Sequence, residues 1–441
     1  MANLVCSCEE RFRSVCEGLP VDFENQGKRY CVLHLPQGSK GPARFTEVIE
    51  QKFKNKDFDF RGVYFPSIPG TLEEPRGFFY NATFEEEADF TDATFQEKSA
   101  YFSEPTFKKS ATFYNATFKG GAFFDRCVFE GDANFNSASF KKRANFYNAT
   151  FEDRARFYMA TFEEEAYFAY ATFKETAWFY DATFREGAIF WSLQTSSPHT
   201  RLSFRAAVID KAERFSFHST NLRPSWFLDV DAQKFDFSDV EWFRLPNGKK
   251  LTLKKEIEFL DGLRRTPGYE RLSPRSNLRR LQRACRQLMN NAEENRDYAT
   301  ANEFHYWSME LLRKEGWRRL GLIGTLYLIL SGYGERPRRA FLVLVEMWIL
   351  FAILYMVWGH KDLQVDLLQV AVQALSGADI RQGLDQAWNA LVYSLAAIAR
   401  LNPEPKPSGP GLFQLLVTAE GLLGPLQIAL LALAIRRKVM R

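Results

Sequence analysis

The stretch Ala155–Phe173, ARFYMATFEEEAYFAYATF, repeats phenylalanine in steps of five, six and five residues, and each phenylalanine follows an alanine two residues earlier. Neither an α-helix, with 3.6 residues per turn, nor a β-strand, with a side-chain period of two, keeps such a set on one face. The stretch therefore predicts a chain that turns a corner every five or six residues.

The same Ala-x-Phe pattern continues far beyond this stretch. Only Pro105 and Cys127 replace the alanine, and no insertion exceeds one residue, which indicates a repeat architecture. The twenty phenylalanines are Phe84, Phe90, Phe95, Phe102, Phe107, Phe113, Phe118, Phe124, Phe129, Phe135, Phe140, Phe146, Phe151, Phe157, Phe162, Phe168, Phe173, Phe179, Phe184 and Phe190.

This pattern resembles the pentapeptide-repeat proteins. The resemblance implies a right-handed quadrilateral β-helix with one unit per side and with the phenylalanine and the small residue pointing inward. Four units make one turn, so we expect Phe157 to stack on Phe179 at a strand spacing of about 4.8 Å. We expect five coils over residues 84–190, within a solenoid over 41–244 that has an irregular insertion near Ser192–Leu202. A β-sandwich is the less favoured alternative.

The outward positions of the repeats carry charges of both signs. Residues 84–190 contain 18 acidic and 12 basic residues, a net charge of −6, which is typical of a solvated face rather than of a strongly acidic DNA mimic. We expect no nucleic-acid partner and no enzymatic activity, because no nucleic-acid motif and no catalytic cluster is present. A protein partner or an effector could still bind these faces.

Two apolar stretches near the C-terminus, Ala340–Trp358 and Leu412–Ile435, each contain a single charge and are long enough to cross a bilayer. Basic residues precede the first stretch (GERPRR) and follow the second (RRKVMR). We therefore expect a bacterial inner-membrane protein with both ends of this hairpin on the cytoplasmic side. The shorter apolar run Leu320–Gly334 predicts an interfacial helix. Two buried helices of a soluble domain are the alternative.

The segment between the two spans resembles the pore region of two-transmembrane, potassium-channel-like subunits. ALVYSL at Ala390–Leu395 is similar to the start of a pore helix, which implies a re-entrant helix over Asp385–Ala399. The second span is similar to an inner helix with Gly421 and Gly424 as its hinge. The resemblance implies a homo-oligomer in the bilayer, most simply a tetramer.

The selectivity filter of that family is missing from this sequence. Where the family has Thr-Val-Gly-Tyr-Gly, this chain has Arg400, Leu401, Asn402, Pro403 and Glu404, so potassium selectivity is not implied. We expect Ser394, Arg400, Asn402 and Glu404 to form the constriction. Glu346 and Glu420 are the charged residues at membrane depth; each is expected either to face a cavity or partner, or to be protonated at a helix contact.

A helical hairpin is predicted over residues 245–319, between the solenoid and the membrane segments. The interfacial helix and the two spans then form a membrane domain over residues 320–441. Its first helix has apolar residues at Leu281, Cys285 and Leu288, and its second runs through ATANEFHYWSMELLRK.

The first 40 residues predict a small metal-binding module. Four of the six cysteines and one of five histidines fall in this segment as Cys6, Cys8, Cys16, Cys31 and His34. Cys-x-x-His at 31–34 supplies two ligands from one turn, and upstream cysteines supply the others, so we expect a structural zinc with four of these five residues as ligands. Free buried thiols are the alternative.

Two functional hypotheses follow from these features. The first is an oligomeric membrane ion channel with a degenerate filter and a cytoplasmic pentapeptide-repeat regulatory domain. The second is a membrane-anchored β-helical interaction scaffold with a vestigial, non-conducting pore.

Overall fold

The computed structural model describes residues 6–35, 42–65, 79–96, 100–195, 201–245, 247–263, 274–315, 317–358, 363, 381–401, 403–406 and 411–439. The chain forms two compact units, Met1–Asn291 and Ala292–Arg441, which are described separately. The boundary lies at the end of the first helix of the predicted hairpin.

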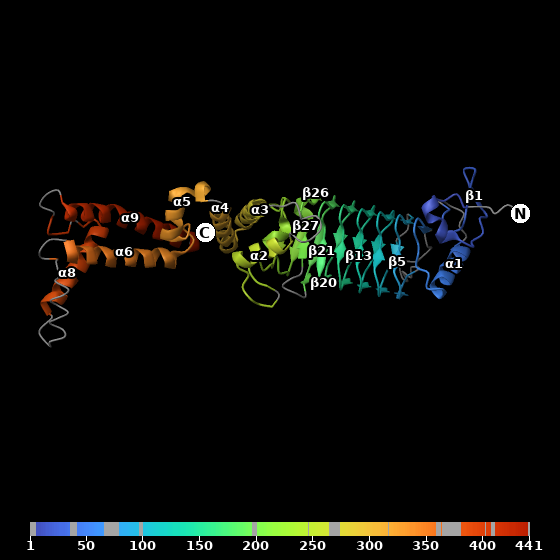
Figure 1. Cartoon of the computed structure of the whole chain (residues 1–441), viewed down its shortest axis with the longest axis horizontal. Helices are drawn as coiled ribbons and strands as arrows, with labels where there is room; N and C mark the ends of the chain where they lie inside the picture. Colours follow the sequence, from blue (N-terminus) through green and yellow to red (C-terminus); the bar gives the residue numbers. More distant parts are fainter. Residues whose placement is uncertain are drawn as a thin grey trace. The chain divides into compact units, whose positions relative to one another are not determined.

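The first unit contains a β-solenoid of about seven turns, built from four parallel sheets (Figure 1). Two sheets have seven strands and two have six. The first consists of β3 (Tyr64–Phe65), β6 (Thr94–Phe95), β10 (Thr117–Phe118), β14 (Ser139–Phe140), β18 (Thr161–Phe162), β22 (Thr183–Phe184) and β26 (Val208–Ile209). The second consists of β7 (Ala100–Tyr101), β11 (Ala122–Phe123), β15 (Ala144–Asn145), β19 (Ala166–Tyr167), β23 (Ala188–Trp191), β27 (Phe215–His218) and β28 (Asp236–Ser238). The third consists of β4 (Thr83–Phe84), β8 (Thr106–Phe107), β12 (Val128–Phe129), β16 (Thr150–Phe151), β20 (Thr172–Phe173) and β24 (Gln194–Thr195). The fourth consists of β5 (Ala88–Asp89), β9 (Ala111–Thr112), β13 (Ala133–Asn134), β17 (Ala155–Arg156), β21 (Thr176–Trp178) and β25 (Arg201–Ser203).

The phenylalanines form the predicted ladders inside the solenoid. Phe157 stacks on Phe179 with 4.7 Å between ring centroids, and Phe162 stacks on Phe184 at 4.8 Å. All twenty predicted phenylalanines are buried. The strands β17 and β21 pair Ala155 with Ala177, which is the alanine four units further along the chain, so four units make one turn as expected.

The flanks of the repeat add turns to the five that were predicted over residues 84–190. The N-terminal flank contributes β3, and the C-terminal flank contributes β25 to β28. The paired residues Ala177 and Leu202 are further apart in the sequence than Ala155 and Ala177, which confirms an insertion in the predicted region. Residues 196–200 of this insertion lie outside the described residues.

Alternate corners of the solenoid have a left-handed backbone. A residue with positive φ recurs at every second corner, including Asn115 (φ 55°), Asn148 (φ 54°) and Asp181 (φ 54°). Asparagine and aspartate tolerate this conformation better than other residues with a Cβ. The five-residue step from Phe157 to Phe162 contains such a corner, at Met159.

Helices cover both open ends of the solenoid lumen. At the N-terminal end, Phe45 and Phe53 of α1 (Pro42–Lys54) pack edge-on against Phe65 and Phe58. Before α1 lie the 3-10 helix η1 (Glu10–Cys16) and a hairpin of β1 (Phe23–Asn25) and β2 (Lys28–Tyr30).

At the C-terminal end, Asn291 of α3 (Pro274–Glu294) donates hydrogen bonds of 2.8 Å to the carbonyls of Gln233 and Phe235. Backbone groups at the edge of a sheet otherwise stay unpaired and invite association with other chains, so these bonds protect the last turn. The short helices η2 (Ala212–Arg214) and η3 (Pro224–Phe227) and the helix α2 (Leu253–Leu263) complete this end.

The second unit is helical, with α4 (Tyr298–Glu315), α5 (Trp317–Ser331), α6 (Pro337–Trp358), α8 (Arg381–Ile398) and α9 (Leu412–Val439). Figure 1 shows α6 and α9 lying side by side along their length. The helix α5 matches the predicted segment 320–334, and the turn after it has three consecutive residues of positive φ, at Gly332, Tyr333 and Gly334.

Two helices of this unit are long and apolar enough to cross a membrane, Pro337–Trp358 and Leu412–Arg436. In the most apolar 18-residue segment of each helix, only 22% of the first and 17% of the second is buried. A core helix of a soluble protein buries most of its apolar side chains. The low burial therefore favours membrane helices over the soluble alternative.

Candidate metal centre and membrane-unit polar cluster

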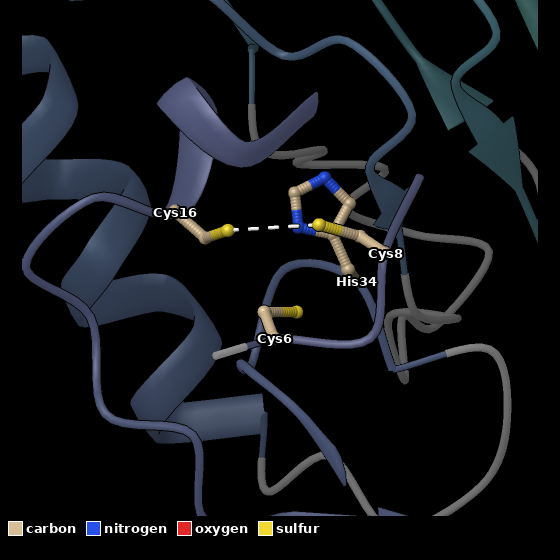
Figure 2. A group of neighbouring side chains, drawn as sticks. All are labelled: Cys6, Cys8, Cys16 and His34. Atoms are coloured by element: carbon tan, nitrogen blue, oxygen red, sulfur yellow. Dashed lines mark hydrogen bonds between the residues drawn. The ribbon is translucent and has the colours of Figure 1, made fainter. Parts of the chain in front are cut away.

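Three cysteines and one histidine converge at the N-terminus of the first unit. The sulfur atoms of Cys6, Cys8 and Cys16 and a ring nitrogen of His34 all lie within 4.8 Å of one another. Cys16 ends η1 and His34 follows β2, and Figure 2 shows the four side chains directed toward a common centre. Cys6, Cys16 and His34 are buried.

The spacing of these atoms fits a tetrahedral metal ion. Zn–S bonds of about 2.3 Å in a tetrahedron require sulfur atoms about 3.8 Å apart. The Cys8 and Cys16 sulfur atoms are 3.7 Å apart. The donor set of three thiols and one imidazole is also one that zinc prefers. The residues therefore fit a structural metal site, which supports the predicted chemistry.

Cys31, the fifth candidate, is fully buried beside this group and contacts Cys6, Cys16 and His34. Its sulfur is 3.3 Å from His34 Nδ1, and its backbone N–H donates to the Cys6 sulfur over 3.3 Å. The four ligand atoms that lie within 4.8 Å of one another include Cys8 and not Cys31, so we expect Cys8 as the third thiol, with Cys31 as the alternative. Sequence spacing alone favoured Cys31.

The ring of His34 is held in one orientation by its second nitrogen. His34 Nε2 lies 3.2 Å from the carbonyl oxygen of Arg61, which can only accept, so Nε2 carries a proton. The other ring nitrogen, Nδ1, therefore faces the sulfur atoms. Such an outer contact sets the tautomer of a metal-binding histidine. The ring also stacks on Phe12 with 6.1 Å between centroids.

Crowding of the thiols changes their acidity. Hydrogen bonds with the thiols of Cys16 and Cys31 lower the pKa of Cys6. Hydrogen bonds with the thiols of Cys31 and Cys6 raise the pKa of Cys16. Burial lowers the pKa of His34, but hydrogen bonds with Cys31 and Cys6 outweigh this and raise it to about 9. Metal binding requires deprotonated thiols and a neutral imidazole, so it would release protons from this group.

The metal module is attached to the first turn of the solenoid. The N–H of Tyr64 in β3 donates to the carbonyl of Leu33 over 3.0 Å. Gly62, with φ +65°, lies under Phe12, and a Cβ at this position would come within 2.5 Å of the ring. The module therefore serves as part of the N-terminal cap of the solenoid.

A buried polar cluster joins three helices of the second unit. Glu420 of α9 is fully buried; it accepts a hydrogen bond of 2.6 Å from the Tyr355 hydroxyl of α6 and is hydrogen-bonded to Ser394 of α8. The sequence predicted Ser394 at a pore constriction, but in the protomer its side chain is fully buried at this helix contact.

The protons of this cluster can be assigned from its geometry. Ser394 Oγ also lies 3.1 Å from the carbonyl of Trp348, which can only accept. Ser394 has one hydroxyl proton, which it can donate either to Glu420 or to the Trp348 carbonyl; when it donates to Trp348, it must accept from Glu420. The chain from Tyr355 to Glu420 to Ser394 to Trp348 is therefore complete when Glu420 is a neutral carboxylic acid. We expect this arrangement, with a protonated Glu420 at the helix contact.

We expect Glu420→Gln to preserve the stability of the membrane unit, because an amide can accept from Tyr355 and donate to Ser394. Glu420→Ala should lower stability by about 1–3 kcal/mol or more, because it leaves buried hydroxyl groups without partners and creates a cavity. Thermal unfolding of the full chain in detergent measures both. Glu346→Ala is the control, because Glu346 is exposed on α6. Equal losses for Glu420→Gln and Glu420→Ala would contradict the proton assignment.

A proline inside α9 explains a contact of Arg400. Pro425 has no N–H, so the carbonyl of Gly421, four residues earlier, loses its intrahelical partner. Arg400 Nε donates to this carbonyl over 3.3 Å. In a bilayer such freed backbone groups need a partner. Pro425 was the sequence signal for this contact, and the sequence prediction did not use it.

The predicted hinge glycines have different surroundings. Gly424 lies against α8, where a Cβ would come within 2.9 Å of the Ile398 Cα, so this glycine permits close helix approach. A Cβ at Gly421 would meet no atom within 4 Å. The helix α9 is continuous through both glycines, and their role as a hinge stays a prediction.

Two further predicted pore residues follow α8. Glu404 is exposed, and Asn402 lies outside the described residues.

The sequence prediction missed the polar contacts of Gln427. This residue is buried and donates to the carbonyls of Leu330 and Ala340 over 2.8 Å each. It ties α9 to α5 and α6.

Comparison with known families identifies one part of the chain. Residues 76–117, 113–158 and 146–192 match a family model described as pentapeptide repeats (9 copies). These segments span 76–192, which is 117 of the 441 residues, so the match is confined to the solenoid. Comparisons with curated proteins and with solved structures found no match.

Proposed function

We propose that this chain is a subunit of an oligomeric membrane ion channel of the two-transmembrane pore type, with a pentapeptide-repeat solenoid as its cytoplasmic regulatory domain. The observation that carries this proposal is the packing of α8, whose C-terminal end contacts the middle of α9.

Two contacts of α8, with α9 and with α6, support the depth in the membrane that we propose for this helix. Ile398, the last residue of α8, touches Gly424, which lies near the middle of α9. At about 1.5 Å per residue, roughly 18 Å of helix precede Gly424 and roughly 22 Å follow it. Ser394 contacts Trp348, which lies midway along α6. A re-entrant pore helix would end at about half the depth of the two spans, and these contacts support that arrangement for α8.

Conduction would require several copies of the chain. Two spans do not enclose an aqueous path, so symmetric copies around an axis, most simply four, would form the pore with α9 lining it. Large apolar side chains such as Leu395 of α8, Ile353 of α6 and Leu422 of α9 are exposed on the protomer and would meet lipid or neighbouring copies. The basic flanks of α6 and α9 favour a cytoplasmic position for both ends.

Side-chain charge would control permeation in such a pore. Arg400 follows the C-terminal end of α8, where a filter with coordinating carbonyls would begin, and both Arg400 and Glu404 are exposed. Without a carbonyl filter we expect weak ion selectivity rather than potassium selectivity.

We expect Arg400→Glu to shift the reversal potential in asymmetric salt toward cation permeation, and Arg400→Gln to give a smaller shift in the same direction. Planar-bilayer recordings of the purified chain measure this. Lys314→Glu, an exposed charge change on α4 outside the spans, is the control and should leave the potential unchanged. Equal potentials in all four proteins would contradict a role of Arg400 in permeation.

The second candidate function is a membrane-anchored interaction scaffold. The contact between Arg400 and the Gly421 carbonyl favours it, because a guanidinium held on the α9 backbone occupies the region of the missing filter. In this case the purified chain would carry no current under any condition and would be a monomer or dimer by native mass. A ring of four with measurable current would exclude the scaffold.

The metal centre has a structural role in either function. Four protein ligands leave no open position for a catalytic water, so a bound zinc would stabilise the N-terminal cap. The solenoid faces would then be available to a protein partner or an effector.

A further inference from the structure

A charged cavity of about 770 Å³ lies in the second unit, at the start of the first apolar span. The first residues of α4, including Tyr298, form one wall, and the residues that lead into α6, Arg336 to Arg338, form another. The N-terminal ends of two helices thus face one cavity. This cavity is separate from the metal centre and from the Glu420 cluster.

The carboxylates that line the cavity are already engaged. Asp297 accepts from the Thr300 N–H over 3.2 Å and so caps α4. Glu303 accepts from Arg336 over 3.2 Å. Glu335 lies 3.4 Å from the ring nitrogen of His305. In the described part of the chain, none of these three acids forms an ion pair with Arg296 or Arg338.

Two arginines at the cavity have no such partner. Arg296 and Arg338 line it and are exposed, and among the described residues neither forms an ion pair or a side-chain hydrogen bond. Arg336, the third, is held by Glu303 and over the ring of Tyr306, with 4.7 Å to the ring centroid. The cavity thus offers two free guanidinium groups beside one that is fixed in place.

We propose that this cavity binds a phosphate-bearing anion. Guanidinium groups pair with phosphate oxygens in a two-pronged geometry, and Arg296 and Arg338 are free to do so. Because Pro337 and Arg338 begin the apolar span α6, the cavity is placed for a phosphate head group of an anionic lipid; a soluble phosphate compound has the same chemistry. The proposal does not depend on whether the chain conducts ions.

The test measures ligand binding to the full-length chain in lipid nanodiscs. Phosphatidic acid in a phosphatidylcholine nanodisc, detected by native mass spectrometry, probes the lipid source. Inorganic phosphate and ATP, titrated by calorimetry against the chain in phosphatidylcholine alone, probe the soluble source. The variants are Arg296→Ala/Arg338→Ala, the charge-preserving Arg296→Lys/Arg338→Lys, and Lys314→Ala as a control that removes a charge from α4 outside the cavity.

We expect the alanine double variant to weaken binding at least tenfold, because each lost charge-assisted hydrogen bond reduces affinity by about that factor. The lysine variant should be intermediate, since it keeps the charge but loses the planar pairing geometry. Binding of the lipid alone, or of the soluble anions alone, supports the proposal and identifies the source. Absence of binding in both arms, or equal losses in Lys314→Ala and the double variant, would overturn it.

Discussion

Replacing Phe157 by alanine is expected to lower the free energy of unfolding of the solenoid by about 3–5 kcal/mol. The ring of Phe157 stacks between Phe135, at 5.0 Å, and Phe179, at 4.7 Å. It also meets Phe146 and Phe168 edge-on, at 5.4 and 5.6 Å. Phe151 and Phe162 are also ring neighbours, and these six aromatic side chains on rigid strands cannot close over the void, so the full cavity cost should be observed.

Urea denaturation of a fragment that ends after α3, at Glu294, measures this change without the membrane helices. Met159→Ala is the control, because Met159 lies in the same turn but is 51% exposed. Since each turn contacts only its neighbours, hydrogen exchange should be faster mainly in the strands next to Phe157. A loss no larger than that of Met159→Ala would contradict the role assigned to the ladders.

Removal of the metal is expected to open the N-terminal cap of the solenoid. A structural zinc contributes about 10–16 kcal/mol of binding free energy in small zinc domains, far more than a module of this size obtains from its apolar core. We expect about one zinc per chain, and its removal by a chelator should increase hydrogen exchange of the Tyr64 amide, which donates to the module at Leu33.

Substitution of individual ligands distinguishes the two possible ligand sets. His34→Ala and Cys6→Ser should abolish zinc binding, because both residues belong to either set. Cys8→Ser should also abolish it, whereas Cys31→Ser should retain zinc, because the four mutually close ligand atoms include Cys8 and not Cys31. Loss in Cys31→Ser with retention in Cys8→Ser would instead assign Cys31, and retention in His34→Ala would remove the metal assignment.

The solenoid could be predicted from the sequence because its pattern is local. Each Ala-x-Phe unit forms one side of a turn, and neighbouring units stack at a constant distance along the chain, so the repeat length alone determines which rings meet. The two apolar helices could be predicted for a similar reason, since length and hydropathy are properties of one continuous segment. The turns at both ends keep the period only loosely, so the sequence predicted five turns for residues 84–190 and only outer limits, 41–244, for the rest of the solenoid.

The sequence by itself thus determined the four-sided repeat, the stacking of Phe157 on Phe179, the two apolar helices and the gathering of cysteines near the N-terminus. Only the tertiary structure decided which residues meet across these elements. The contact of Glu420 with Tyr355 and Ser394, and the convergence of Cys8 with Cys6, Cys16 and His34, depend on how helices and loops pack against one another. That packing joins segments that are distant in the chain, as Glu420 and Tyr355 are, and no local period in the sequence encodes it.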